Sequence, residues 1–185
     1  MLDRQPVLED GRLLLRPLRA EDWDALFAVA ADPLVWEQHP AHDRWQESVF
    51  RAFFADALAQ GGALIAIDKA DGAVIGSSRF QGLEEANGGS VEIGWTFLAR
   101  SRWGGGFNPA MKRLMLAHAL ASVCECRFLV GETNTRSRRA LENIGARLTD
   151  RREERIMAGG AVIPHLTYVI TRESFGTGPL TRASP

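Results

Sequence analysis

Residues 90–109 read SVEIGWTFLARSRWGGGFNP, and this stretch decides the fold. Its first nine residues alternate in polarity, which predicts a strand over 90–98. The alternation assigns two faces: Val91, Ile93, Trp95 and Phe97 on one, and Glu92, Gly94 and Thr96 on the other. A glycine run at 104–106 leads into a helix over 110–121, with Asn108 as its cap and Pro109 in its first position. Such a turn forms an anion site, because free N–H groups and the helix dipole point at the anion.

The usual anion at such a turn is a pyrophosphate. The loop sequence limits the classes of nucleotide that could carry this pyrophosphate. A P-loop needs Gly-Lys-Ser/Thr after the glycines, whereas Phe107, Asn108 and Pro109 follow here. A dinucleotide-binding G-x-G-x-x-G motif needs a glycine where Pro109 stands. Neither motif fits, and a glycine turn that holds no ligand remains the alternative from the loop alone.

Outward from this stretch the pattern alternates between strands and helices. Strands are predicted over 13–16, 63–67, 73–80, 127–132, 147–157 and 165–171, and further helices over 19–32, 45–59 and 135–143. This order predicts a mixed α/β (α+β) domain on a largely antiparallel sheet. We expect one domain over residues 1–175 and a flexible tail over 176–185, which is rich in Gly, Thr, Ser and Pro.

Composition excludes several classes of protein. The chain has 185 residues, 45% of them hydrophobic and 24% charged, and a net charge of -1, so no basic excess points to nucleic acid. Cys124 and Cys126 form a C-x-C pair and are expected to be reduced, structural thiols. His39 and His42 lack the Cys or clustered carboxylates of a metal site. No signal peptide or membrane-length apolar run is present, which predicts a cytoplasmic protein.

Three stretches together resemble the GNAT superfamily of N-acetyltransferases, in particular the ribosomal-protein-alanine acetyltransferase subgroup. VEIGWTFLARSRWGGGFNPAMKRLML at 91–116 resembles the acetyl-CoA motif Q/R-x-x-G-x-G/A that follows a bulged strand. LEDGRLLLRPLRAEDWDALFAVAADPLVW at 8–36 resembles the subgroup's first strand and helix, and NTRSRRALENIGA at 134–146 resembles the segment after the splayed strand. Trp103 and Asn108 depart from the motif, and Leu141 stands where many relatives have a tyrosine acid. The resemblance implies a twisted, mostly antiparallel sheet flanked by helices, with the coenzyme cleft at its splayed central strands.

The resemblance also implies roles in binding acetyl-CoA. The main chain of Phe97 and Leu98 would pair with the pantetheine arm, and Asn134 would bond to it. Ser137 would lie near the thioester sulfur and supply the proton that the leaving thiolate needs. Trp103 stands at the first position of the motif. The backbone amides expected to hold the pyrophosphate follow it, at Gly104, Gly105, Gly106, Phe107 and Asn108.

Catalysis needs a base, because an amine is largely protonated at neutral pH. Glu92 is the candidate, directly or through a water, since partial burial would raise its pKa toward the working range. The alternative is a surface or salt-bridged glutamate. The candidate acceptor-binding residues are Trp36, His39, Arg44 and Arg79. Arg79 suggests an anionic group on the acceptor, or else an internal ion pair with Glu92 or Asp43.

The function expected is direct transfer of an acetyl group from acetyl-CoA to a primary amine in a ternary complex, with no covalent enzyme intermediate. The acceptor is a small molecule or a protein N-terminus, and the bulk of Trp36, Trp45 and Phe80 favours the small molecule. A non-catalytic acyl-CoA sensor and an interaction domain on the same scaffold are the alternatives. A homodimer through the last strands is expected by family analogy, and no metal, membrane or nucleic-acid partner is expected.

Overall fold

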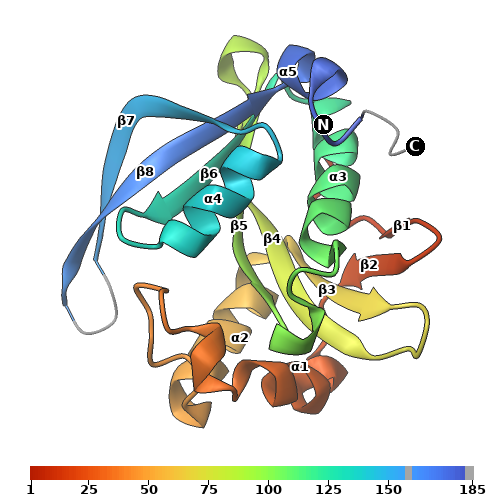
Figure 1. Cartoon of the computed structure of the whole chain (residues 1–185), viewed down its shortest axis with the longest axis vertical. Coiled ribbons are helices and arrows are strands. Elements are labelled where there is room, and N and C mark those ends of the chain that lie inside the picture. The colour runs from red at the N-terminus through yellow and green to blue at the C-terminus, as the bar shows by residue number, and fades with distance from the viewer. Residues whose placement is uncertain (157–159, 182–185) are drawn as a thin grey trace.

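A computed structural model describes residues 1–156 and 160–181 of the chain. Its core is one eight-stranded sheet in the order β1-β2-β3-β4-β5-β6-β8-β7 (Figure 1). The strands are β1 Leu8–Glu9, β2 Leu13–Pro17, β3 Ala63–Asp68, β4 Val74–Glu84, β5 Ser90–Leu98, β6 Glu125–Gly131, β7 Arg147–Ile156 and β8 Val162–Thr171. All neighbouring pairs are antiparallel except β5 and β6, which are parallel. The mixed, mostly antiparallel sheet predicted from the sequence is confirmed.

Helices cover both faces of this sheet and divide the apolar side chains into two cores. The α-helices are α1 Trp23–Ala30, α2 Glu47–Gln60, α3 Phe107–Leu120, α4 Thr135–Asn143 and α5 Arg172–Thr177. One core joins α3 and α4 to the sheet, through side chains such as Met115 and Leu141. The other joins α1 and α2 to the opposite face, through side chains such as Leu26 and Phe50. The sheet is therefore the middle of three layers.

The two central strands separate soon after they meet. β5 and β6 pair only from Ser90–Glu125 to Glu92–Arg127. Beyond that point β5 continues to Leu98 with β4 as its partner, while β6 continues to Gly131 with β8 as its partner. In Figure 1, β5 and β6 lie side by side at one end and diverge toward the other. It leaves one edge of β5 without a strand partner in the middle of the sheet.

A β-bulge at the parting corrects the predicted faces of β5. Trp95 adopts a left-handed backbone conformation (φ 52°), and the register with β4 shifts between Ser77 and Arg79. An extra residue in one strand turns all later side chains to the other face. Ile93 therefore packs in the α3 core, whereas Phe97 packs in the α2 core and Thr96 contacts α3. The prediction of one face for positions 91, 93, 95 and 97 is wrong for this reason.

Element ends also differ from the predicted ones. α3 begins at Phe107, and its cap is Gly106 in the left-handed conformation rather than Asn108. β6 begins at Glu125, so that Cys126 is a buried strand residue. The predicted flexible tail from 176 begins inside α5, which a reciprocal cap between Thr171 and Ser174 stabilises, and Leu180 packs on the α3 core. The remainder of that predicted tail, 182–185, lies outside the described residues.

Candidate active site

The free edge of β5 carries main-chain groups that face the gap toward β6. The N–H of Ala99 donates to Ile75 O on β4. Because a trans peptide points its C=O opposite to its N–H, the carbonyl of Leu98 faces the open side. The side chains of Phe97 and Leu98 are buried in the two cores, so only their backbone is available to a ligand. A free strand edge can pair with an extended arm through its main chain, which is the role that the resemblance implies for Phe97 and Leu98.

The glycine turn lies at the end of the same edge. Among the described residues, none accepts a hydrogen bond from the N–H groups of 104–108, and Gly106 caps α3 without a side-chain bond. The Arg12 guanidinium stacks on the Phe107 ring at 3.8 Å and lies 3.2 Å from where a Gly106 Cβ would be. Free amides beside a guanidinium at the start of a 14-residue helix suit a pyrophosphate. Sequence reasoning missed Arg12, because it is brought here from the start of β2.

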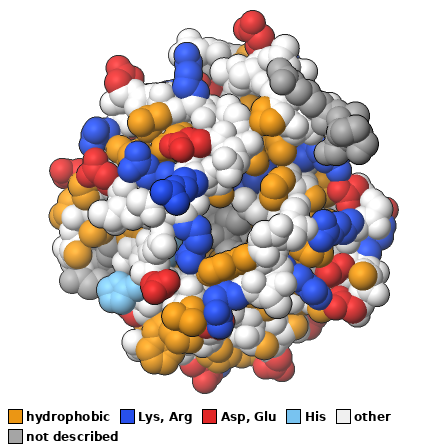
Figure 2. Space-filling model, in the orientation of Figure 1, with side chains coloured by type: hydrophobic (Ala, Val, Ile, Leu, Met, Phe, Trp, Pro, Cys, Tyr) orange, Lys and Arg blue, Asp and Glu red, His pale blue; other side chains and the backbone are white. Residues whose placement is uncertain are grey.

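Trp103 and Arg136 lie across the mouth of the gap. Trp103 Nε1 donates to Leu98 O at 2.9 Å, and the Arg136 guanidinium lies 4.2 Å from the Trp103 ring. The Leu98 carbonyl thus already has one donor, and its second lone pair is what a ligand would use. Figure 2 shows Lys and Arg side chains around a central hollow on this face of the molecule. Positive charge at the mouth favours an anionic coenzyme.

The beginning of α4 borders the gap from the β6 side. Asn134 is buried, and its Oδ1 accepts from the Ser137 N–H at 3.1 Å, so this side chain caps α4. Ser137 is half-buried in the first turn of the helix. Leu141, at the position of the missing tyrosine, is buried in the α3 core. The first turn of α4 carries two hydroxyl groups: Thr135 is exposed and donates to Gln38 Oε1, whereas Ser137 is half-buried.

A cavity of about 810 Å³ opens on the α2 side of the parting strands. Its walls come from the segment 39–44, from α2, from β5 and from the β7–β8 pair. The polar side chains in its lining include His39, Arg44, Glu92, Arg155 and His165, and the apolar ones include Val49, Phe53, Trp95, Leu129 and Ile163. An apolar cavity with a few charged groups beside the coenzyme edge is the candidate acceptor site.

Glu92 lies in this cavity and is held by an ion pair. Arg155 Nη2 donates to Glu92 Oε2 at 2.8 Å and to Oε1 at 3.1 Å. Burial raises the pKa of Glu92 above its ordinary value, while Arg155 acts in the opposite direction. Gly94 leaves room for the carboxylate, because a Cβ there would lie 3.0 Å from Oε1. The structure thus pairs Glu92 with Arg155, and Glu92 still lines the cavity, so the ion pair does not decide whether Glu92 acts as a base.

Two histidines of the cavity are held neutral. Burial, followed by the nearby charge of Arg44, lowers the pKa of His39 to about 3. His39 Nδ1 accepts from the Ala41 N–H at 2.9 Å. Burial also lowers the pKa of His165, whose Nδ1 lies 2.9 Å from the carbonyl oxygen of Ile163 and donates to it. His165 is a second group in the cavity that could take a proton, since its Nε2 is then unprotonated.

Two of the predicted acceptor residues are not in the cavity lining. Trp36 is 1% exposed, packs on Phe97 and donates from Nε1 to Ala30 O, so it is a core residue. Arg79 is buried and pairs with Asp56 at 2.8 Å, not with Glu92 or Asp43. Phe80 is also fully buried in the α3 core, and Trp45 is exposed outside the cavity lining, so the argument from bulky aromatics for a small acceptor loses all three of its residues. His39 and Arg44 do line the cavity.

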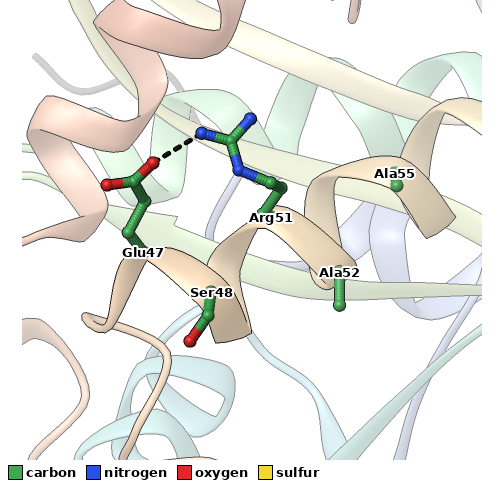
Figure 3. A pocket seen from close by; sticks show the side chains of 5 residues that line it. All are labelled: Glu47, Ser48, Arg51, Ala52 and Ala55. Atoms are coloured by element: carbon green, nitrogen blue, oxygen red, sulfur yellow. Dashed lines mark hydrogen bonds and ion pairs between the residues drawn. The ribbon is translucent and has the colours of Figure 1, made fainter.

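A second hollow, of about 730 Å³, lies along α2 and is lined by Glu47, Ser48, Arg51, Ala52 and Ala55 (Figure 3). All five residues come from the exposed face of α2. Its charged pair, Glu47 and Arg51, is joined across one helical turn as the dashed line in Figure 3 marks. Within the part of the chain that the structure describes, no other element contributes to its lining, so this hollow lacks the converging polar groups of a binding site.

Lys112 is a buried cation that sequence reasoning overlooked. The chain has only two lysines, and this one is 4% exposed on the sheet side of α3. Its ammonium donates to Thr96 Oγ1 at 2.6 Å and to Ser78 Oγ at 3.4 Å, directly behind the β5 bulge. The sequence does indicate that Lys112 is buried, because helical spacing puts position 112 on the same side of the helix as Met115 and Leu116.

We expect the stability of the fold to depend on pH through Lys112. Burial lowers its pKa from 10.5 to about 7, so the folded state releases this proton more readily than the unfolded state does. The neutral form of Lys112 therefore contributes its full stability to the fold above pH 10.5, and this contribution is lost as the pH falls toward 7. The difference in unfolding free energy between wild type and Lys112→Met should rise in favour of wild type from pH 7 to pH 10, by on the order of a few kcal/mol.

Urea unfolding at several pH values measures this difference. Lys69→Met is the matched control, because Lys69 is exposed and pairs with Glu9 on the surface. A pH-independent difference for Lys112→Met would show that its ammonium is not desolvated in the fold.

Over 1–156 and 160–181, no helix has the length and hydropathy to cross a bilayer. Over the same residues, no group of three or more His, Cys, Asp or Glu side chains is arranged to hold a metal ion.

A mixed sheet that parts between two parallel strands, with a glycine turn and a helix start at the free edge, is the architecture of an acyltransferase domain. A family model described as "Acetyltransferase (GNAT) domain" matches residues 12–147, and the chain belongs to this family of GNAT acetyltransferases. No curated protein sequence matches the chain.

Solved structures share the fold at low sequence identity. RimJ of Mycobacterium smegmatis in complex with CoA-disulfide is 23% identical, with a TM-score of 0.74 over 98% of this chain and 95% of RimJ. A GNAT-family acetyltransferase from Bacillus anthracis is 21% identical, with a TM-score of 0.72 over 91% of this chain and 99% of that one. Spermidine N-acetyltransferase from Vibrio cholerae, in complex with CoA and spermine, is 15% identical, with a TM-score of 0.65 over 90% and 99%.

Proposed function

We propose that this protein transfers an acetyl group from acetyl-CoA to a primary amine in a ternary complex. The observation that carries the proposal is the free β5 edge, which has the glycine turn at one end and the Glu92 cavity on the α2 side of the same parting. A coenzyme along the edge and an acceptor in the cavity would approach each other at the β5 bulge. The M. smegmatis RimJ complex supports a CoA ligand and is in line with the subgroup resemblance.

The residues of the cleft have complementary roles in this proposal. Acetyl-CoA supplies an activated thioester. Main-chain groups of Phe97 and Leu98 and the amides of 104–108 hold the coenzyme, with Arg12 beside its phosphates. Glu92 takes the proton that the amine loses as the C–N bond forms and the C–S bond breaks. Ser137 is the donor to the departing sulfur.

The test of this function uses the whole protein, acetyl-CoA and a panel of amines, with released CoA thiol and acetylated amine measured together. Equal amounts of both products support N-acetyl transfer. Binding of acetyl-CoA without turnover of any amine would favour the non-catalytic sensor instead. The cytoplasmic location and the homodimer expected from the sequence stay predictions.

Direct transfer predicts that neither cysteine is needed. Burial raises the pKa of Cys126 to about 12, so its thiol is not a nucleophile at neutral pH. Cys124 is exposed and directly precedes β6, next to the end at which β5 and β6 are paired. The double variant Cys124→Ser, Cys126→Ala should keep kcat within about 3-fold of wild type. Mass spectrometry during turnover should find no acetylated cysteine, and an acetyl-cysteine that forms and decays at the rate of turnover would contradict the direct mechanism.

A further inference from the structure

Three arginines and two aromatic rings form a continuous stack beside the acceptor cavity, with Arg79 buried outside the cavity lining. The Arg44 guanidinium lies 4.6 Å from the Phe53 ring, and Arg79 lies 5.7 Å from the same ring. Arg79 also lies 5.0 Å from the Trp95 ring, which Arg155 approaches to 5.4 Å. We call these five residues the arginine stack. Aromatic faces attract guanidinium groups without neutralising their charge.

Carboxylates neutralise only two of the three guanidinium groups. Arg155 pairs with Glu92, and Arg79 pairs with Asp56. Over the part of the chain that the structure describes, no carboxylate forms an ion pair with Arg44, and Asp43 acts on it only at longer range. Of the three guanidinium groups in the arginine stack, Arg44 is therefore the one without an ion pair; Asp43 also lines the cavity but forms none with it.

His39 adds a second donor beside Arg44. Its Nδ1 accepts the Ala41 N–H, so the proton of the neutral imidazole is on Nε2. That Nε2 lies 3.5 Å from Arg44 Nη1, and both atoms are donors. Two donors that face each other in a half-buried cavity need an acceptor between them or beside them. A carboxylate oxygen meets this need and also neutralises the guanidinium.

We propose that the acceptor is an amine that also carries a carboxylate, and that Arg44 and His39 bind this carboxylate while the amine faces Glu92. The inference rests on the proposed function and names its substrate class. Val49, Phe53 and Leu129 in the cavity lining suit an apolar side chain on the same molecule, beside its amine and its carboxylate. A polyamine, in contrast, would bring several positive charges to the arginine stack and be repelled.

Matched pairs of amines test the proposal. Phenylalanine and phenethylamine, and tryptophan and tryptamine, differ only in the carboxylate, and spermidine represents the polyamines. With acetyl-CoA and thiol release as the readout, we expect kcat/KM to be about 10- to 100-fold higher for the carboxylate member of each pair. Arg44→Met should reduce this ratio to near one and leave the affinity for acetyl-CoA unchanged.

Arg51→Met is the matched control, because Arg51 is an exposed arginine of α2 outside this cavity and should not change the ratio. Preference for phenethylamine, tryptamine or spermidine would overturn the inference and leave amine acetylation standing. An equal loss on both members of each pair in Arg44→Met would also overturn it, since the residue would then act on folding alone. Binding of acetyl-CoA with no turnover of any amine would instead overturn the proposed function, and with it this substrate class.

Discussion

Gly106→Glu is expected to abolish binding of acetyl-CoA and CoA. Gly106 caps α3 with φ at 80°, and its amide is one of the donors proposed for the pyrophosphate. A glutamate there adds a carboxylate where an anion should bind, and like charges at a binding interface cost several kcal/mol. We therefore expect the dissociation constant to rise by at least about 100-fold, measured by calorimetric titration of CoA into the protein.

Gly72→Glu separates this effect from backbone strain. Gly72 has φ at 72° in the turn between β3 and β4, and nothing lies within 4 Å of a Cβ built there. Both variants carry the cost of a left-handed non-glycine residue, about 1–2 kcal/mol, which urea unfolding would measure. Gly72→Glu should nevertheless bind CoA as wild type does. Equal loss of CoA binding in both variants would assign the effect to stability, and undiminished binding by Gly106→Glu would remove the coenzyme from the glycine turn.

The coenzyme edge could be predicted from the sequence because it is built from consecutive residues. The strand at 90–98, the glycine turn and the helix after it follow from local alternation and helix-start rules. Even there, the bulge at Trp95 was named as a family feature but not counted in the alternation. One residue with positive φ was enough to turn Phe97 and Thr96 to the faces opposite to those predicted.

The acceptor cavity was harder to predict, because its members come from distant segments. The prediction of Trp36 and Arg79 as acceptor residues rests on their polar or small neighbours in the sequence, but the burial of a side chain depends on which element packs over it. Arg79 finds its carboxylate on α2, at Asp56, and Glu92 finds its guanidinium on β7, at Arg155. Partners 23 and 63 positions away along the chain leave no local pattern. Only the tertiary packing decides which charges are neutralised and which, as at Arg44, face the cavity.

Glu92→Gln is expected to lower kcat by about 10²- to 10⁴-fold and to leave the affinity for acetyl-CoA within a factor of two, as removal of a general base does. The glutamine keeps the shape of the side chain and loses the proton acceptor. Glu125→Gln is the matched control, since Glu125 is a strand glutamate of β6 that pairs with Arg151 outside the cavity. It should retain kcat. A kcat for Glu92→Gln near that of wild type would remove Glu92 from proton transfer.

The pH profile identifies which group is the base. Burial raises the pKa of Glu92, so kcat/KM of wild type should fall on the acidic side with an apparent pKa above that of an ordinary glutamate, about 4.3. Because Arg155 lowers this pKa, Arg155→Gln should move the acidic limb to higher pH, which a merely structural role of the ion pair would not do. His165→Gln should keep the limb in place if Glu92 is the base. If the limb instead disappears in His165→Gln and persists at reduced rate in Glu92→Gln, the neutral imidazole of His165 takes the proton, and Glu92 serves to hold Arg155.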